Sequence, residues 1–233
     1  MNGKPVKALM FKESLNQGLA ETVAALDREH YPESLLEIIE AVLLDLSCRR
    51  GLPLLAFAIN GAGADAEQCY QSAEIVWQGM LLTALLTAED DPTDGLVAGL
   101  AQGYDTAHLL LAADTLLTLP FEFCTGKGDT VKAGQLAGCA RRALENFDEL
   151  GEEQSGLDGW RPLGFLLTEL CPAASQSLLS KNSGLIDLAY ATDLIRWLGP
   201  RPWLISRRDR TLKKSTSQNA RPELLEVCSL LKG

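Results

Sequence analysis

Residues 33–46 read ESLLEIIEAVLLDL, and this stretch decides the predicted fold. Its apolar residues recur at intervals of three and four, which places them on one face of a helix that packs against a core. A proline directly before the stretch, Pro32, is well placed to open that helix. The pattern predicts a helix over 33–46 whose buried stripe is Leu35, Ile38, Ile39, Val42, Leu43 and Leu46.

The same helical spacing continues through most of the chain. Residues 66–87 predict a long central helix, which Pro92 prevents from continuing smoothly. Further helices are expected at about 104–119, 130–150, 162–179 and 185–198, with a short one after Pro222; Pro120, Gly151, Gly184 and Gly199 separate these stripes. No internal repeat and no marked change in composition divides the chain. The sequence therefore predicts an all-α protein that forms a single domain over residues 1–233.

One segment competes with the helical interpretation. Residues 54–59 (LLAFAI) fit a buried strand, and Gly61, Gly63 and Ala66 behind it fit G-x-G-x-x-A, the opening of a dinucleotide-binding turn. That turn belongs to a β-α-β unit followed by further strands. The chain beyond Ala66 shows helical stripes without β-branched alternation, so the helix is favoured and the strand stays the alternative.

The composition indicates an ordinary folded protein. A chain of 233 residues can bury about 70% of its unfolded surface, and 46% hydrophobic with 22% charged residues exclude a disordered chain. No apolar run approaches the roughly 20 residues of a membrane span, and the first ten residues lack the apolar stretch of a signal peptide. We expect no membrane span and a cytoplasmic location.

The cysteines are scattered along the chain without a C-x-x-C pair, and small or apolar residues flank most of them. We therefore expect buried or partly buried free thiols rather than disulfides or a zinc site. The residues concerned are Cys48, Cys69, Cys124, Cys139, Cys171 and Cys228.

The formal charge of the chain is −10, which does not supply the basic field of a nucleic-acid-binding protein, so no nucleic-acid partner is expected. One local exception is the basic segment 200–222. It holds Arg207, Arg208, Arg210, Lys213 and Lys214 against the single acid Asp209. Two interpretations remain open for this segment: a solvated, mobile loop, or a flap that binds an anion.

Catalytic motifs built on histidine or on a nucleophilic serine have few candidates. Only His30 and His108 occur, and the chain contains no GxSxG, HExxH or phosphate-loop motif. What remains is a carboxylate cluster, EDDPTD at 89–94, whose oxygens are of the type that holds Mg²⁺ against a phosphate. The same residues also fit a solvent-exposed loop that ends a helix, and on local grounds the loop is favoured.

Four segments of the chain share the order and spacing of a known set of motifs. Residues 105–123, DTAHLLLAADTLLTLPFEF, match GEALAILAGDALLTLAFEL, and residues 48–76 match GKRLRPLLVLAAAEALGGDPE followed by AAAIE. Residues 134–135 match a GQ pair, and residues 188–197, LAYATDLIRW, match LAFQIVDDILD. Over about residues 30–200 the chain thus resembles the trans-prenyltransferases, which make polyprenyl diphosphates such as farnesyl diphosphate.

The resemblance implies an isoprenoid-synthase-like helical bundle around a central cavity, shorter than usual in this chain. In that family, two aspartate-rich motifs hold Mg²⁺ ions that draw the diphosphate away from an allylic substrate, and isopentenyl diphosphate attacks the resulting carbocation. Several carboxylates must converge on the metal ions, because the departing charge otherwise has no partner in an apolar pocket. Basic residues of the GKRxRP and KT motifs hold diphosphate groups, which assigns that role to Arg49, Arg50 and Arg161.

The first aspartate-rich motif departs from the family pattern. Leu85 and Leu86 stand where DDxxD is expected, and Asp90, Asp91 and Asp94 spell that motif about five residues later. A proline inside this displaced motif distorts the helix end that normally aims the carboxylates.

The second motif and the basic motifs are also eroded. Asp193 is the one acid that the second motif keeps, and Arg196 lies in the region of another acid. Leu52 replaces the second arginine of GKRxRP, and Arg161 replaces the lysine of KT. A lone Asp193 does not replace a cradle of three carboxylates.

Three hypotheses about function follow. The favoured one is a non-catalytic or regulatory subunit of a heteromeric prenyltransferase, which needs no cofactor of its own. It works as a homo- or heterodimer with a prenyltransferase subunit and takes a prenyl diphosphate as ligand. The alternative is an active Mg²⁺-dependent enzyme in which Asp90, Asp91, Asp94 and Asp193 hold the metal. The third is a helical binding protein unrelated to isoprenoids, whose packing lacks a deep central cavity. Under any of these hypotheses, Arg49 and Arg50 also have a structural alternative, which is to cap the helix that ends near Cys48.

Overall fold

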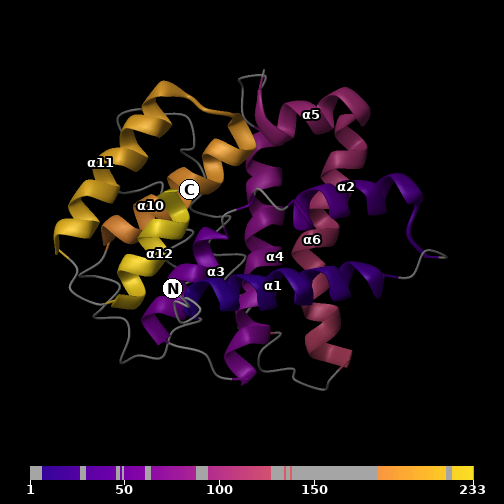
Figure 1. Cartoon of the computed structure of the whole chain (residues 1–233). Helices are drawn as coiled ribbons and strands as arrows, with labels where there is room; N and C mark the ends of the chain where they lie inside the picture. Colours follow the sequence, from indigo (N-terminus) through magenta and orange to yellow (C-terminus); the bar gives the residue numbers. More distant parts are fainter. Residues whose placement is uncertain are drawn as a thin grey trace, which may run out of the picture.

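The computed structural model of the chain describes residues 7–26, 30–45, 48, 50–60, 64–87, 94–126, 134, 137, 183–218 and 222–232. Helices make up nearly all of this part, which contains no strand (Figure 1). The helices are α1 (Lys7–Ala24), α2 (Glu33–Leu43), α3 (Gly51–Asn60), α4 (Ala64–Thr87), α5 (Gly95–Gly103), α6 (Thr106–Gly126), α10 (Ser183–Leu198), α11 (Pro202–Gln218) and α12 (Pro222–Lys232). The prediction of an all-α protein is confirmed, and the isoprenoid-synthase-like arrangement around a cavity stays a prediction.

The strongest apolar stripes became helices at nearly the predicted positions. Helices α4 and α10 each begin two residues earlier than the predicted 66–87 and 185–198 and end where predicted, and α12 begins at Pro222. Helix α2 buries the predicted stripe from Leu35 to Leu43 but ends at Leu43, three residues before the predicted end, and the last stripe residue, Leu46, lies outside the described residues. The predicted helices at 130–150 and 162–179 lie outside the described residues, apart from positions 134 and 137.

The segment that competed as a strand is helix α3, so the strand alternative is wrong. Its apolar residues show no helical stripe because the helix is buried on all sides, packed by α1, α4, α10 and α12. Phe57 of α3 stacks on Phe11 of α1 with ring centroids 4.4 Å apart. Because residues 54–59 belong to α3, the strand that a dinucleotide-binding turn must follow is absent there, and that interpretation fails with the strand.

Two other expectations need correction. Helix α6 does not end at Leu119 but runs through Pro120 to Gly126, and Leu116 and Leu119 in the turn before the proline are buried, so packing there offsets part of the lost hydrogen bond. The basic segment is not a loop, since α11 occupies residues 202–218. Pro202 opens that helix, where its missing N–H is not needed, and Leu204 and Leu212 bury its inner face.

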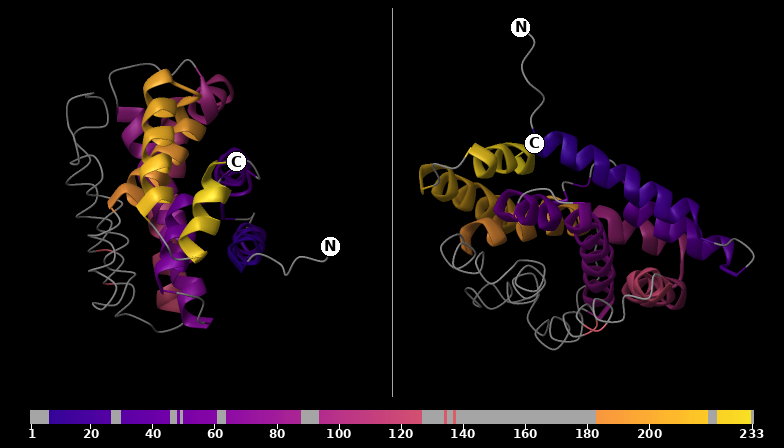
Figure 2. Two further views of the ribbon diagram at one scale, coloured as in Figure 1. Left: turned by 60° about the vertical axis from the view of Figure 1, so that its left-hand side comes forward. Right: turned by 90° about the horizontal axis from the view of Figure 1, so that it is seen from below.

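The arrangement of the helices separates the molecule into two sides. Helices α4 and α6 lie side by side with α2 packed on them, while α10, α11 and α12 gather on the other side, and α5 packs on the end of α10 (Figures 1 and 2). A Cβ placed on Gly79 would lie 2.9 Å from the Cβ of Leu116, so α4 and α6 approach closely there. Helix α3 connects the two sides, and the polar network described next surrounds its first turn.

Candidate functional site

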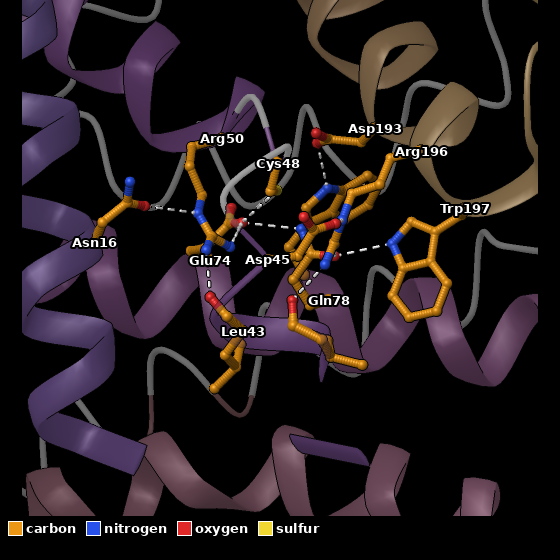
Figure 3. A network of polar contacts seen from close by, with 12 residues as sticks. Asn16, Leu43, Asp45, Cys48, Arg50, Glu74, Gln78, Asp193, Arg196 and Trp197 are labelled. Carbon is orange, nitrogen blue, oxygen red and sulfur yellow. Dashed lines mark hydrogen bonds and ion pairs between the residues drawn. The ribbon is translucent and has the colours of Figure 1, made fainter. Parts of the chain in front are cut away.

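Three of the residues expected to bind diphosphate or metal belong to the described part of the chain: Arg50, Asp94 and Asp193. The others, Arg49, Asp90, Asp91 and Arg161, lie outside the described residues, and their roles stay predictions. Arg50 and Asp193 belong to one buried polar network at the meeting point of α2, α3, α4 and α10 (Figure 3). Asp94 lies apart from that network, at the start of α5.

Arg50 is the first centre of the network. Only 1% of it is exposed, and each of its guanidinium nitrogens has a protein partner. Nε donates to Asn16 Oδ1 over 3.2 Å, Nη1 forms an ion pair with Glu74 Oε1 at 3.1 Å, and Nη2 donates to the Leu43 carbonyl. The backbone at Arg50 has φ +57°, a left-handed conformation that a residue with a side chain adopts only when its surroundings hold it there.

Arg196 is the second centre and lies on α10. Its Nε forms an ion pair with Asp45 Oδ2 at 2.9 Å, and its Nη1 donates to Gln78 Oε1 over 3.0 Å. Its Nη2 donates to the Val42 carbonyl over 2.5 Å and to the Ala41 carbonyl over 3.4 Å. The resemblance expects an acid in this region, and the structure shows a cation that already has acidic and carbonyl partners.

Both arginines bind carbonyl groups in the last turn of α2. The final carbonyls of a helix have no partner within the helix and carry the negative end of its dipole, so guanidinium groups stabilise them. Arg50 binds the carbonyl of Leu43, and Arg196 binds those of Ala41 and Val42. These contacts stabilise the end of α2 at Leu43. They also match the capping role that the sequence left open for Arg50.

Gln78 joins the two centres. Its Oε1 accepts from Arg196 Nη1 and from Trp197 Nε1, the latter at 2.9 Å, while its Nε2 donates to Glu74 Oε1 over 2.9 Å. Glu74 Oε1 therefore accepts from Gln78 and Arg50 together, and its other oxygen, Oε2, has no hydrogen-bond partner among the described residues. A continuous chain of polar contacts thus runs from Arg50 to Arg196.

Asp193 lies beside this chain of contacts and is 1% exposed. Its Oδ2 accepts from Trp77 Nε1 over 2.9 Å, and its Oδ1 has no partner among the described residues. Burial and the nearby negative charge of Glu74 raise the pKa of Asp193 from 3.8 to about 7, against the opposing effects of Trp77, Arg196 and the backbone N–H of Gly51. Two arginines and two ion-paired carboxylates already balance in charge, so a neutral Asp193 leaves the buried network neutral.

Cys48 completes the network from the α2–α3 connection. It is a free and buried thiol whose Sγ lies 4.0 Å from Glu74 Oε1, at hydrogen-bonding distance for sulfur. Burial raises the pKa of this thiol, although the charge of Arg50 acts in the opposite direction. The thiol form is not nucleophilic, so Cys48 fills space and donates weakly rather than reacting. Cys228 is likewise free and buried, as expected for both positions.

Asp94 has a structural position at the start of α5. Its Oδ1 accepts from the Gly95 N–H over 2.9 Å, as a side chain at a helix N-terminus does. A Cβ on Gly199 would lie 2.8 Å from Asp94 Cγ, so the end of α10 passes directly over this aspartate. Across the described residues, no three His, Cys, Asp or Glu side chains gather closely enough to hold a metal ion.

The sequence interpretation missed Gln78 and Asp45 and gave Glu74 no role of its own. A signal for two of these residues was present, because Glu74 and Gln78 stand four positions apart in a segment, 73–82, that is otherwise apolar. Polar residues one turn apart on a buried helix indicate a buried polar network. Nothing local marked Asp45 as the partner of Arg196.

The polar network therefore combines a helix cap, two ion pairs and a buried carboxyl, and it connects α2, α4 and α10. Among the described residues of this network, the thiol is protonated and the carboxylates accept hydrogen bonds from arginine, glutamine and tryptophan side chains. No helix of the described chain is both long enough and apolar enough to cross a membrane. No protein-family model matches this chain, and no curated protein matches it significantly.

Proposed function

We propose that this protein is a non-catalytic or regulatory subunit of a heteromeric prenyl diphosphate synthase. The proposal rests on the resemblance over about residues 30–200 and on one structural observation. Asp193, the acid that the resemblance leaves in the second metal motif, is buried, bonded to Trp77 and has a pKa raised to about 7.

That environment opposes metal binding by Asp193. Mg²⁺ takes ionised oxygen ligands and keeps several of its waters, so a ligand for it must be charged and reachable by solvent. Asp193 is 1% exposed, and its pKa of about 7 leaves it substantially protonated at neutral pH. One turn away, Arg196 adds a fixed positive charge paired with Asp45. In this proposal Asp193, at the position where the family binds metal, helps to hold α10 against α4 through its hydrogen bond to Trp77.

Arg50, which the resemblance assigns to diphosphate binding, is likewise buried and already bonded to protein groups. A diphosphate that bound Arg50 would have to replace Glu74 and the Leu43 carbonyl, both of which hold the guanidinium inside the protein. Replacing buried partners of this kind is strongly unfavourable unless the ligand supplies equal charge and equal burial. These contacts favour a role in which the chain contributes a stable helical body to an assembly.

In this proposal a catalytic partner supplies the Mg²⁺ site, and this chain stabilises the partner and alters the chain length of its product. The assembly is a dimer in the cytoplasm, where the free thiols of Cys48 and Cys228 persist. A prenyl diphosphate held by the partner, or shared between the subunits, is the expected ligand.

A radiolabelled prenyl-transfer assay tests the proposal. Isopentenyl diphosphate, allylic diphosphates of several lengths and Mg²⁺ are incubated with the purified chain alone, with a catalytic prenyl diphosphate synthase alone, and with both. We expect no product from the chain alone. In the mixture, the product length or the rate should change several-fold, and Asp193→Asn should preserve this effect because the amide replaces a buried carboxyl that binds no metal in this proposal.

Other outcomes would contradict the proposal in distinct ways. Product from the chain alone, lost in Asp193→Asn or in an Asp90→Ala variant, would establish the active Mg²⁺-dependent enzyme instead. A folded chain that neither makes product nor affects any prenyl diphosphate synthase would favour a helical binding protein unrelated to isoprenoids. Asp114→Asn on α6, an exposed carboxyl, serves as the matched control.

A further inference from the structure

Helix α11 concentrates positive charge on an acidic protein. Residues 201–214 contain one acid, Asp209, whereas the whole chain carries a formal charge of −10. The basic residues of this stretch are Arg201, Arg207, Arg208, Arg210, Lys213 and Lys214. The remainder of the protein is therefore more acidic than its net charge suggests, and α11 is a local region of opposite sign.

The helix separates its charge from its buried face. Leu204, Thr211 and Leu212 are buried, whereas Arg210 and Lys214 are exposed. Positions 203, 207, 210 and 214 recur at intervals of four, three and four, which places them on one face of the helix. Over that interval the face extends for about 16 Å. It begins with the indole of Trp203, which is 42% exposed, and continues with basic side chains.

The inner edge of this face is attached to the body of the protein. Arg207 is half-buried, and its positive charge lowers the pKa of Tyr190 on α10, although burial, the larger influence, raises that pKa. The close packing of α10 on α11 holds the face in place (Figure 2). Trp203, Arg210 and Lys214 are thus presented on a helix whose orientation is set before a partner arrives.

We propose that the Trp203–Lys214 face of α11 docks an acidic helical segment of a partner protein. Exposed aromatic residues act as anchors in protein interfaces, and each flanking cation adds a small attraction for a carboxylate one turn further along. The proposal does not depend on the prenyltransferase resemblance, because any acidic helix with an apolar residue opposite Trp203 satisfies it.

The charge of the whole molecule argues for a protein segment and against a larger polyanion. Nucleic acid and anionic membranes extend well beyond one helix, so they would also meet the acidic remainder of this chain and be repelled by it. A single acidic helix matches the length of the basic face and avoids that repulsion. Charged groups separated by more than about 8 Å are screened at physiological salt, so a short partner interacts mainly with α11.

A binding titration with a defined probe tests this proposal. The probe is a fluorescent synthetic helix of Leu and Glu about twelve residues long, and its control has Gln in place of Glu. We expect the Glu peptide to bind the full chain at low salt and to lose about tenfold in affinity as salt is raised. Arg210→Glu with Lys214→Glu should abolish this binding.

Matched variants separate the face from general effects of charge and hydrophobicity. Lys7→Glu with Lys232→Glu reverses two exposed cations on α1 and α12 and should leave the affinity within about twofold. Trp203→Ala should weaken binding about tenfold or more, whereas Leu225→Ala, which removes a side chain 39% exposed on α12, should not. Circular dichroism confirms that each variant is folded.

The proposal is overturned if the Arg210 and Lys214 reversal binds the Glu peptide as tightly as the unmodified chain. It is equally overturned if the Gln peptide binds as well as the Glu peptide. Binding to phosphatidylserine vesicles or to an RNA oligonucleotide, with none to the peptide, would assign the face to a different class of partner.

Discussion

Trp77 donates its indole N–H to Asp193 over 2.9 Å, which joins residues that are 116 positions apart in the chain. The contact connects α4 to α10 at a point where both helices are buried, and it fixes the position of an acid that would otherwise be a candidate for metal binding. Its consequences for stability can be measured directly.

Asp193 should make the stability of the protein depend on pH. Its pKa is about 7 in the folded protein and 3.8 as its ordinary value, so the folded state binds an extra proton between these two values. The stabilisation supplied by that proton is fully present below about pH 4 and is lost as the pH rises through 7. Between about pH 4 and pH 7 the free energy of unfolding should fall by about 1.4 kcal/mol per pH unit because of Asp193. Asp193→Asn should not show this fall.

Urea unfolding of the two proteins at pH 5, 6, 7 and 8 gives the comparison. The free energy of unfolding of Asp193→Asn should rise relative to the unmodified chain as the pH increases. A difference that stays constant with pH would show that Asp193 is ionised throughout. Asp114→Asn on the exposed face of α6 controls for the removal of a carboxyl as such.

Glu74→Gln should destabilise the fold because it removes the carboxylate that forms an ion pair with Arg50 inside the protein. Removing one partner of a buried ion pair lowers the free energy of unfolding by about 3–5 kcal/mol. Both side chains are at most 1% exposed, so the pair belongs to this class. Adding Arg50→Met should recover much of the loss, and urea unfolding measures both steps.

A matched exposed substitution, Glu13→Gln on α1, should change the free energy of unfolding by less than about 0.5 kcal/mol. If Glu74→Gln were as mild as this control, the guanidinium of Arg50 would have to be solvated in solution. The central position assigned to this ion pair would then be wrong.

Arg196→Lys should weaken the end of α2 although it keeps the positive charge. Lysine has no planar fork, so it cannot bind Asp45, Gln78 and the Val42 carbonyl at once. We expect a loss of about 2–4 kcal/mol. Arg208→Lys, whose ion pair with its neighbour Asp209 is exposed, should change the stability by less than about 0.5 kcal/mol.

Hydrogen exchange locates the effect of Arg196→Lys. Amides of the last turn of α2 should exchange faster in Arg196→Lys than in Arg208→Lys, because an uncapped helix end frays. Equal exchange in the two variants would contradict a capping role for Arg196.

Gly95→Ala and Gly199→Ala should each destabilise the junction between α5 and α10. The two glycines have φ of +83° and +78°, and a Cβ on Gly95 would lie 2.3 Å from the Gly199 nitrogen. The combined strain and overlap should lower the free energy of unfolding by about 2 kcal/mol or more. Thermal unfolding followed by circular dichroism is sufficient to detect it.

Gly99→Ala is the control for these variants, since a Cβ there meets no atom within 4 Å. Within α5 an alanine is a better helix former than glycine by about 0.5–1 kcal/mol, so this change should stabilise. A destabilising Gly99→Ala would mean that α5 tolerates no substitution, and the argument from close approach would lose its support.

The sequence could predict residues of the site but not their bonding partners, because those partners are distant in the sequence. Asp193 and Arg50 were chosen as candidates from the sequence, and the structure brings both into one network, but as buried structural groups. Their partners Asn16, Glu74 and Trp77 come from other helices, so the local sequence around either residue carried no indication of how it is bonded.

The sequence by itself predicted where α2, α4 and α10 lie, because the apolar spacing over 33–46, 66–87 and 185–198 is a local property of each segment. Tertiary structure alone supplied the partners that stabilise the end of α2 at Leu43. The two guanidinium groups that satisfy its last carbonyls come from positions 50 and 196, and the second of these is brought near only by the packing of α10 on α3. Tertiary packing also decided that α3 is a helix, since an apolar segment buried on all sides has no polar face to mark its period.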